Sequence, residues 1–406
     1  MADGFGMLHS LFVTSTTEEE GGLRKVYKDH NLHVFFGVTL MAVLGVSSIT
    51  PAFPRIRDAL GISTGEVGLL ITVFTLPGIF LAPVLGVLSD RHGRKKILMP
   101  ALLLFGIAGG LCTFARSFEL LLVLRLFQGM GAGALGTLNV TVIGDIYSGR
   151  ERSAAMGYNS SVLSIGTAGY PAIGGLLATL GWYYPFALAF VAIPIGFLVL
   201  FSLRNPEPHN EQRMADYFGS VWANLRSREV FGLLCVSLFT FIILFGPQIT
   251  YLPILMDERF GAPPYVIGGI LSCASLTTAL TSSQLGRLTG FFSEKVLLKA
   301  AFLVYAAALL MVPFVPSVWL LIPPAVLFGA AQSLNLPNTF SLLSSHAPAE
   351  NRGAFMSVNG MTLRAGQTLG PLLMAATSSF LGLTGAFLAA SILAAVTFLL
   401  VLFLVR

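Results

Sequence analysis

Long apolar runs dominate this sequence and leave few folds open to it. A helix needs about 20 apolar residues to cross a bilayer. Hydrophobic residues make up 55% of the chain and charged residues only 11%, whereas soluble domains carry about 25% charged residues. The pattern predicts an all-α integral membrane protein with twelve transmembrane helices, at 32–53, 65–88, 97–115, 118–144, 154–178, 183–203, 230–254, 265–286, 296–315, 317–341, 353–378 and 382–405.

Matching residues 200 positions apart divide the chain into two related halves. Arg152, Asn159, Gly166 and Pro171 correspond to residues of the same type at 352, 359, 366 and 371. We therefore expect two pseudo-symmetric six-helix bundles, related by an axis along the membrane normal. The expected divisions are a cytoplasmic leader at 1–31, bundles at 32–203 and 230–406, and a cytoplasmic linker at 204–229.

The basic residues are distributed unequally between the two sides of the membrane. If the N-terminus is cytoplasmic, most Lys and Arg fall on that side, and only Arg55, Arg57, Arg116 and Arg259 fall on the opposite side. Because cytoplasmic segments collect Lys and Arg, both termini are predicted to be cytoplasmic, in the cell inner (plasma) membrane. The cytoplasmic Lys and Arg account for the net charge of +5, so this charge does not indicate a nucleic-acid partner. The expected partners are the lipid bilayer and a small-molecule substrate, and the chain is expected to be monomeric.

The segment 86–95 joins the second and third predicted helices and reads Gly-Val-Leu-Ser-Asp-Arg-His-Gly-Arg-Lys. It resembles the signature loop of the major facilitator superfamily, Gly-x-Leu-x-Asp-Arg/Lys-x-Gly-Arg/Lys-Arg/Lys, at every fixed position. The resemblance implies that Asp90 pairs with Arg94 and with an acid at the inner end of helix 4, where Asp145 stands. We expect these residues to form a conformational latch that favours the outward-open state. The alternative is a topology signal without a switching role.

A second motif lies in the fifth predicted helix. Residues 166–175 read Gly-Thr-Ala-Gly-Tyr-Pro-Ala-Ile-Gly-Gly and resemble the antiporter motif Gly-x-x-x-Gly-Pro-x-x-Gly-Gly of twelve-helix drug:proton antiporters, the multidrug efflux family. Within the superfamily this motif marks exporters, although Tyr170 stands where the motif has glycine. The motif residues are Gly166, Tyr170, Pro171, Gly174 and Gly175.

Arg125 begins the run Arg-Leu-Phe-Gln-Gly-Met-Gly, which resembles the Arg-x-x-Gln-Gly-x-Gly pattern of helix 4 in the same family. It is expected about 10 Å into the membrane at 1.5 Å per residue. In family terms this arginine is associated with proton transfer. The alternative is that it holds helix 1 by bonds to backbone carbonyls. A membrane-embedded arginine is costly and is a functional candidate under either interpretation.

The resemblance implies a central cavity lined by helices 1, 4, 7 and 10 and flanked by helices 2, 5, 8 and 11. Arg364, about 16 Å into helix 11, is the most unusual residue expected there. We predict that it binds an anionic group of the substrate; the alternative is an internal anchor bonded to Asn335 or Gln332. The candidate substrate-binding residues are Arg364, Gln332, Asn335, Gln367, Gln128, Asn359 and Gln248.

The antiporters that this chain resembles usually carry an acid deep in the N-terminal half, and none is found at middle depth here. Glu66 and Asp58, near the outer face, are the best remaining candidates for proton coupling, together with Arg125. Two arginines without a deep carboxylate suit an anionic or amphiphilic substrate better than a multivalent cation. The leading hypothesis is a proton-coupled exporter of small amphiphilic compounds. The second is a uniporter or exporter of a specific anionic metabolite or lipid.

Enzymatic classes find little support in the sequence. No phosphate-binding Gly-x-x-x-x-Gly-Lys-Ser/Thr loop is present, and no catalytic constellation lies at one membrane depth. The histidines form no cluster, and Cys112, Cys235 and Cys273 lie within apolar runs. We therefore expect no enzyme, no metal site and no cofactor, with the proton gradient as the energy source.

Overall fold

The fold is given by a computed structural model that describes residues 26–203, 227–346 and 352–405. Most of the expected leader and linker therefore lies outside the described residues. The first described helix begins at His30, where the Asp29 side chain accepts a hydrogen bond from the backbone N–H of Asn31.

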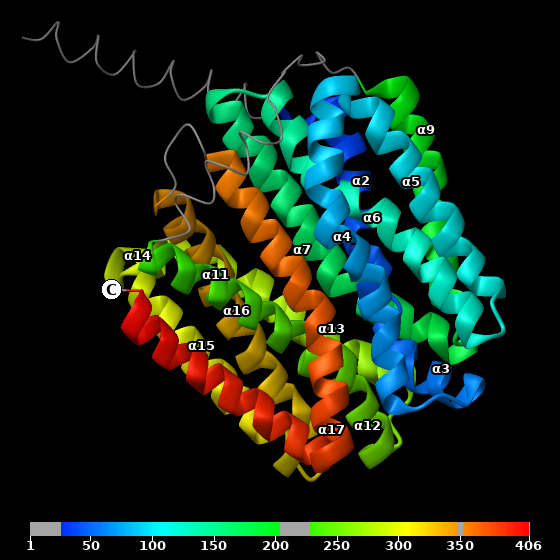
Figure 1. Ribbon diagram of the computed structural model, residues 1–406, viewed down its shortest axis with the longest axis vertical. Helices are drawn as coiled ribbons and strands as arrows, with labels where there is room; N and C mark the ends of the chain where they lie inside the picture. The colour runs from blue at the N-terminus through cyan, green and yellow to red at the C-terminus, as the bar shows by residue number, and fades with distance from the viewer. Residues whose placement is uncertain (1–25, 204–226, 347–351, 406) are drawn as a thin grey trace, which may run out of the picture.

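The described residues are almost entirely helical and contain no strand (Figure 1). The principal elements are α2 (His30–Ser47), α3 (Phe53–Leu60), α4 (Thr64–His92), α5 (Arg94–Leu111), α6 (Phe118–Ile146), α7 (Gly149–Leu180), α8 (Tyr184–Ala187), α9 (Ala192–Ser202), α11 (Arg228–Ile243), η4 (Leu244–Tyr251), α12 (Leu252–Phe260), α13 (Pro264–Ser283), α14 (Leu285–Phe291), α15 (Glu294–Met311), α16 (Ile322–His346) and α17 (Arg352–Leu404).

The expected all-α membrane fold is confirmed. In the described part of the chain, 11 helical segments are long and apolar enough to cross a membrane. The last of them, α17, is two helices that meet at Gly382, whose φ of 67° and ψ of 177° are not helical. A positive φ suits glycine because it has no Cβ. Counting both parts of α17 gives the twelve spans that the apolar runs predict.

The seventh span departs from the single regular helix expected at 230–254. It begins as α11, widens into a π-helical stretch, η4, and returns to α-helical geometry in α12. Pro247 lies inside η4 and has no N–H to donate to the helix ladder. Such wide turns often occur at functional positions.

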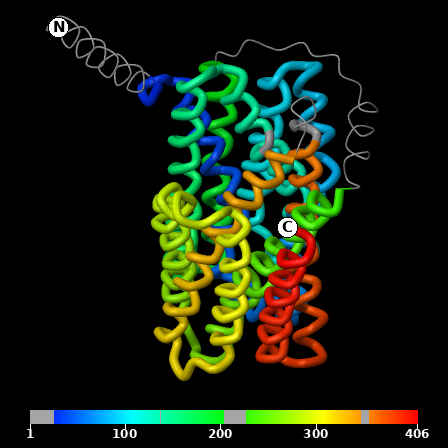
Figure 2. Tube along the Cα trace, turned by 90° about the vertical axis from the view of Figure 1, so that its left-hand side faces the viewer, coloured from blue at the N-terminus to red at the C-terminus, as the bar shows by residue number. Residues whose placement is uncertain are grey.

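Each half has its own hydrophobic core, as expected for two bundles. One core lies within the N-terminal half and includes Phe35, Phe105 and Leu135. Another lies within the C-terminal half and includes Phe302 and Phe328. Figures 1 and 2 show the two halves as adjacent bundles, coloured blue to green and green to red.

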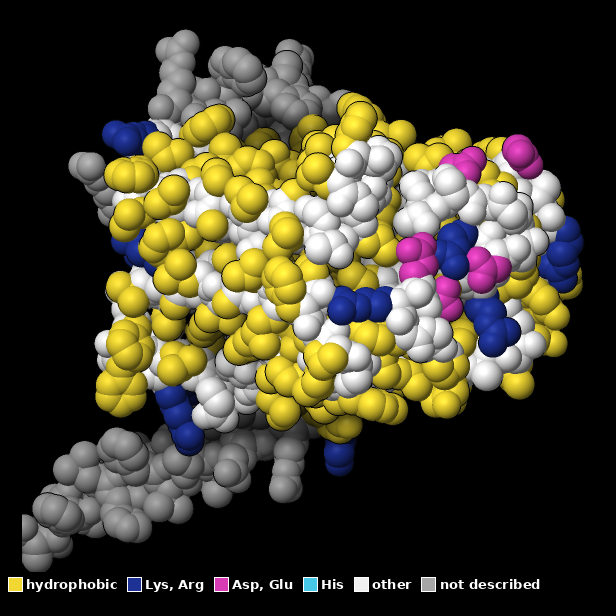
Figure 3. Space-filling view, turned by 90° about the horizontal axis from the view of Figure 1, so that it is seen from below, with side chains coloured by type: hydrophobic (Ala, Val, Ile, Leu, Met, Phe, Trp, Pro, Cys, Tyr) yellow, Lys and Arg dark blue, Asp and Glu magenta, His cyan; other side chains and the backbone are white. Residues whose placement is uncertain are grey.

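A third cluster joins the two bundles at the end that carries α3 and α12. It packs Phe53 and Ile71 of the first half with Phe245 and Ile254 of the second. We call this end outer and the opposite end inner, following the distribution of basic residues. The outer face is shown in Figure 3, where acidic and basic side chains gather in one region of a largely hydrophobic surface.

Large apolar side chains on the exterior give the molecule a surface suited to lipid. Phe80 and Phe201 are among the most exposed, at 64% and 79%. Exposed apolar surface on this scale would be costly in water and is the normal state of a helix facing hydrocarbon.

Candidate transport site and the contacts that join the two halves

Arg364 of α17 reaches from the C-terminal half into the N-terminal half. Its side chain lies against Gly78 of α4, where an added Cβ would be 3.2 Å from Arg364 Cδ and Nε, and its Nη2 lies near Gly136 of α6. The one described hydrogen bond of its side chain runs from Nη1 to Gln367 Oε1 at 3.4 Å. A guanidinium has five N–H donors, so most of its hydrogen-bonding capacity remains for another group.

The expected alternative anchor for Arg364 does not form. Asn335 Nδ2 instead donates to Thr240 Oγ1 at 2.7 Å, and its Oδ1 accepts from Thr339 Oγ1 at 2.9 Å. Asn335 therefore links α16 to α11 within one half. Gln332 is half-buried on α16, and no described hydrogen bond joins it to Arg364.

Two further candidates carry buried polar atoms that lack a partner among the described residues. They are Asn359 Oδ1 on α17 and Gln248 Nε2 on η4, and the two side chains are 1% and 5% exposed. An unsatisfied buried polar atom costs free energy, so each marks a position where a bound molecule or water would be stabilising.

Arg125 is fully buried and hydrogen-bonded to the backbone of two helices. Its Nη1 donates to Gly45 O of α2 at 2.7 Å, and its Nε donates to Leu70 O of α4 at 3.1 Å. Its guanidinium also lies 4.1 Å from the centre of the Phe74 ring. These contacts agree with the alternative that Arg125 anchors the first membrane helix, α2, through backbone carbonyls. The structure adds a second anchored helix, α4.

Gln128 lies beside Arg125 and accepts from its Nη1 at 2.8 Å. Its amide packs so closely on Gly109 of α5 that a Cβ there would overlap it. The structure thus places Gln128 against a neighbouring helix, although the sequence made it a candidate for substrate binding.

A polar network in the N-terminal half was missed by the sequence reasoning. Thr39 Oγ1 of α2 donates to Asn159 Oδ1 of α7, and Asn139 Nδ2 of α6 donates to Thr39 Oγ1. Asn139 Oδ1 is buried without a described partner. The related network of the other half contains Thr240, Asn335 and Thr339. Asn139 and Thr339 are 200 positions apart and are therefore equivalent in the repeat. The equivalence was overlooked because the two residues are of different types.

The expected latch residues lie together at the inner end of the first half. Arg94 Nη1 pairs with Asp90 Oδ1 at 2.6 Å, and its Nε pairs with Asp145 Oδ2 at 2.8 Å. Gly93 makes the turn with a φ of 99°, which brings the first turn of α5 back towards α4. The ion pairs join α4, α5 and α6. Their role in switching stays a prediction.

The antiporter-motif glycines of α7 lie where backbones approach closely. A Cβ on Gly174 would overlap O of Ser48, the residue that caps the C-terminal end of α2, and one on Gly175 would overlap Pro264 O of α13. A Cβ on Gly166 would come 3.0 Å from the side chains of Leu40 and Val43. Tyr170, the departure from the motif, packs on the core of its own half.

Close contacts between α7 and α13 recur between α4 and α17 at repeat-related positions. Gly268 of α13 faces Pro171 O of α7, and Gly68 of α4 faces Pro371 of α17. Both residues of the second contact are 200 positions from their counterparts in the first. The pseudo-symmetry predicted from the sequence therefore extends to the interface between the halves.

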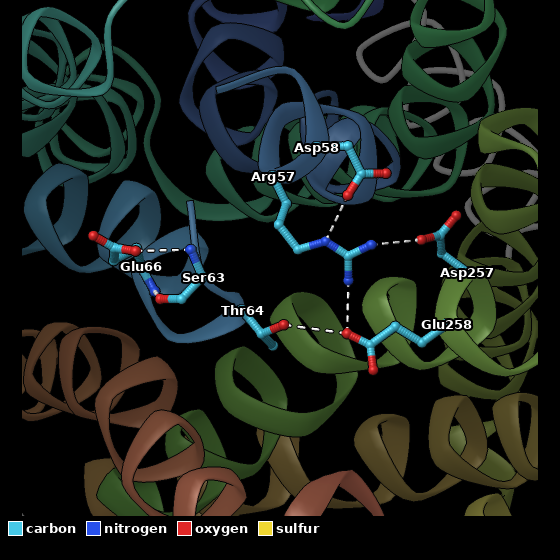
Figure 4. Close-up of polar contacts among 7 residues, drawn as sticks. All are labelled: Arg57, Asp58, Ser63, Thr64, Glu66, Asp257 and Glu258. Carbon is cyan, nitrogen blue, oxygen red and sulfur yellow. Dashed lines mark hydrogen bonds and ion pairs between the residues drawn. The ribbon is translucent and has the colours of Figure 1, made fainter. Parts of the chain in front are cut away.

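The outer ends of the halves are also joined by charged groups, shown in Figure 4. Arg57 Nη2 pairs with Asp257 Oδ2 at 3.0 Å, and its Nη1 pairs with Glu258 Oε1 at 2.6 Å. Arg57 Nε pairs with the adjacent Asp58 at 2.8 Å. Thr64 Oγ1 donates to Glu258 Oε1 at 3.2 Å.

Glu66, a candidate for proton coupling, closes a capping box at the start of α4. Its Oε2 accepts from Ser63 N at 2.7 Å, and its own N–H donates to Ser63 Oγ at 3.3 Å. Glu66 and Asp58 both lie at the exposed outer rim. The structure gives Glu66 a local structural role and Asp58 an ion pair, whereas their part in coupling stays a prediction.

The glycines of α7 differ in what surrounds them along the helix. On α7, Gly175 meets backbone of the other half, but a Cβ on Gly157, five turns nearer the inner end, would meet nothing within 4 Å. Gly360, near the inner end of α17, is equally unobstructed.

Two pseudo-symmetric membrane bundles around a polar site define a secondary transporter. The family model of the Major Facilitator Superfamily matches residues 35–269 and 234–406, and the chain belongs to this family. It is a multi-pass membrane transporter and not an enzyme.

Several characterised proteins resemble the chain over most of its length. The bacillibactin exporter of Bacillus subtilis strain 168 is 27% identical over 368 residues, covering 86% of this chain and 90% of that protein. The class D tetracycline resistance protein of Salmonella ordonez is 26% identical over 344 residues, covering 83% and 87%. The similarity to efflux proteins agrees with the resemblance seen in the motifs.

The fold itself matches solved transporters. The nucleoside transporter NupG superimposes with a TM-score of 0.80 over 93% of this chain and 100% of that chain, at 11% identity. At this identity the match concerns the fold alone.

Proposed function

We propose that the protein exports small amphiphilic compounds from the cytoplasm by alternating access, coupled to proton entry. It acts as a monomer in the plasma membrane with both termini cytoplasmic. The observation that carries this proposal is Arg364, a cation with unused donors that projects from one half into the other. A substrate with an anionic group would bind there by charge-assisted hydrogen bonds.

Export as the direction of transport is supported by two independent features. The glycines of the antiporter motif hold α7 against α2 and α13. The relatives described above include a bacillibactin exporter and a tetracycline resistance protein. Bacillibactin and tetracycline are therefore suitable first probes.

A second candidate function is export of an anionic compound without proton coupling. It is favoured by the position of the acids: every described Asp and Glu within a membrane span lies near one end of its helix. An anion leaving a cell with a negative interior is driven by about 2.3 kcal/mol per charge per 100 mV. Such a transporter needs no proton-carrying carboxylate.

Flux into proteoliposomes separates the two candidates. The purified protein is reconstituted with a pH-sensitive dye in the lumen, and each probe is added with and without an imposed proton gradient. Proton-coupled export predicts that transport of a probe moves protons in the opposite direction. Transport that responds to membrane potential but moves no protons would contradict the first candidate and support the second.

A further inference from the structure

The charged cluster at the outer end is built from equivalent positions of the two repeats. Arg57 and Asp257 are 200 positions apart, and so are Asp58 and Glu258. A pseudo-symmetry axis along the membrane normal brings equivalent helix ends to the same level on either side of it. Like charges at such positions would repel, whereas Arg57 and Asp257 have opposite charges and bind each other at 3.0 Å.

The cluster joins the halves through side chains that water can reach. The Arg57 side chain is 16% exposed, and those of Asp257 and Glu258 are 28% and 39% exposed. Ion pairs in such surroundings are individually weak. They can therefore break and re-form in each cycle, unlike the Arg125 contacts inside the first half.

Opening of the outer end requires this cluster to separate. Arg57 is on α3, and both of its partners in the other half are on α12. The first residue of α4, Thr64, also joins the halves by donating to Glu258 of α12. A path from the central site to the outside cannot form between α3 and α12 while these bonds are intact.

We propose that Arg57, Asp257 and Glu258 form the outer gate, and that protons from the external medium release it. This inference rests on the proposed alternating-access function. One guanidinium faces three carboxylates, those of Asp58, Asp257 and Glu258, so the cluster has an excess of negative charge. A proton on the Asp257 carboxylate removes its ion pair with Arg57 and weakens the closed state.

The other charged groups around the cluster are engaged elsewhere or face solvent. Glu66 caps α4 through Ser63, and Arg259 donates to Pro313 O. Arg55 is exposed on α3, with no ion pair among the described residues. None of them takes the place of Arg57 between the halves.

The gate controls which side is open and does not itself carry protons inward. When the outer end is closed, the exposed sides of Asp257 and Glu258 still face the external medium. A proton bound while the gate is open therefore returns to that medium when Arg57 rebinds. The gate is thus distinct from any coupling site deeper in the molecule.

Distance measurements across the outer ends of the two halves test the gate directly, with one label on α3 and the other at the start of α13. Spin labels are placed at Ala59→Cys and Tyr265→Cys, both exposed, in the full-length protein with its three native cysteines replaced and reconstituted in nanodiscs. Arg57→Gln should increase the population with the long distance severalfold. Arg55→Gln removes the same charge from the same helix and should leave the distribution unchanged.

The exchanged pair Arg57→Asp with Asp257→Arg should restore the short distance. In the protein with Arg57 intact, acidification should raise the long-distance population, and in Arg57→Gln it should add little. Equal distributions in Arg57→Gln and Arg55→Gln would overturn the gate. An equal acid response with and without Arg57 would overturn its release by protons. Because these readouts need no substrate, failure to find any transported compound would count against the proposed function and not against the gate.

Discussion

Arg125 and Arg364 are both embedded in the membrane, but their surroundings give them different tasks. Arg125 is enclosed within one half and bonded to carbonyls of α2 and α4. Arg364 reaches from one half to the other, and the one described hydrogen bond of its side chain is to Gln367, one turn further along α17. The first arrangement stabilises a bundle. The second leaves a cation with unused donors at the contact between the two halves.

Replacing Arg125 by Gln distinguishes its two interpretations. The variant loses charge-assisted bonds to two helices, so we expect a loss of stability of about 2–4 kcal/mol. Thermal unfolding of the purified protein should show a lower midpoint. An unchanged midpoint with loss of proton-linked transport would contradict the structural role and favour proton transfer.

Gly78 determines whether Arg364 can reach the first half. Valine at this position would place methyl groups where the Arg364 side chain lies, since even a Cβ would be 3.2 Å from its Cδ. We expect Gly78→Val to lower transport at least tenfold, because small displacements of binding groups have effects of this size. Gly360→Val is the control, since Gly360 has open space around it. Similar transport by both variants would contradict this role.

At the scale of elements, α13 and α7 form one of two equivalent contacts between the halves. Their backbones touch at Gly268 and Pro171, and no side chain separates them there. Small residues allow such approach between membrane helices.

The neighbouring glycines Gly268 and Gly269 provide a matched test of this contact. A Cβ on Gly268 would overlap Pro171 O, whereas one on Gly269 would meet nothing within 4 Å. Gly268→Ala should therefore separate the outer ends of the halves. A cysteine introduced between these ends should then be labelled faster by an external thiol reagent. Gly269→Ala should label like the parent protein. Equal labelling of the two variants would show that the contact does not hold the outer end closed.

In the whole molecule, the two six-helix bundles are joined at their outer ends by the ion pairs of Arg57 with Asp257 and Glu258. The latch ion pairs of Arg94 are formed while the outer ends are joined. Formation of these pairs therefore does not by itself select the outward-open state. If the latch favours that state, it must do so through contacts with the other half that change as the molecule opens.

The architecture could be predicted from the sequence because its causes are local and repeated. Apolar length determines a span, and Gly and Pro at a constant offset mark equivalent turns and contacts. Even so, the π-helical stretch around Pro247 was not predicted, because a proline in an apolar run does not specify how the surrounding turns adjust.

The partners of polar side chains were harder to predict, because they depend on how each helix is rotated about its axis. Gln128 faces Gly109 and Arg125 instead of a cavity, and Asn335 bonds Thr240 instead of Arg364. Arg57 was used only to assign the sides of the membrane. The repeat places Arg57 and Asp257 at equivalent positions. Their pairing could be predicted only by comparing residues of different types at such positions.

We propose that a substrate binds between the halves through Arg364. The most direct test is the rate of probe uptake by proteoliposomes containing Arg364→Gln, with Arg364→Lys and the parent protein beside it, all at matched amounts of folded protein. We predict that Arg364→Gln abolishes transport of a probe with an anionic group and that Arg364→Lys retains part of it. Transport by Arg364→Gln at the rate of the parent protein would contradict substrate binding by Arg364.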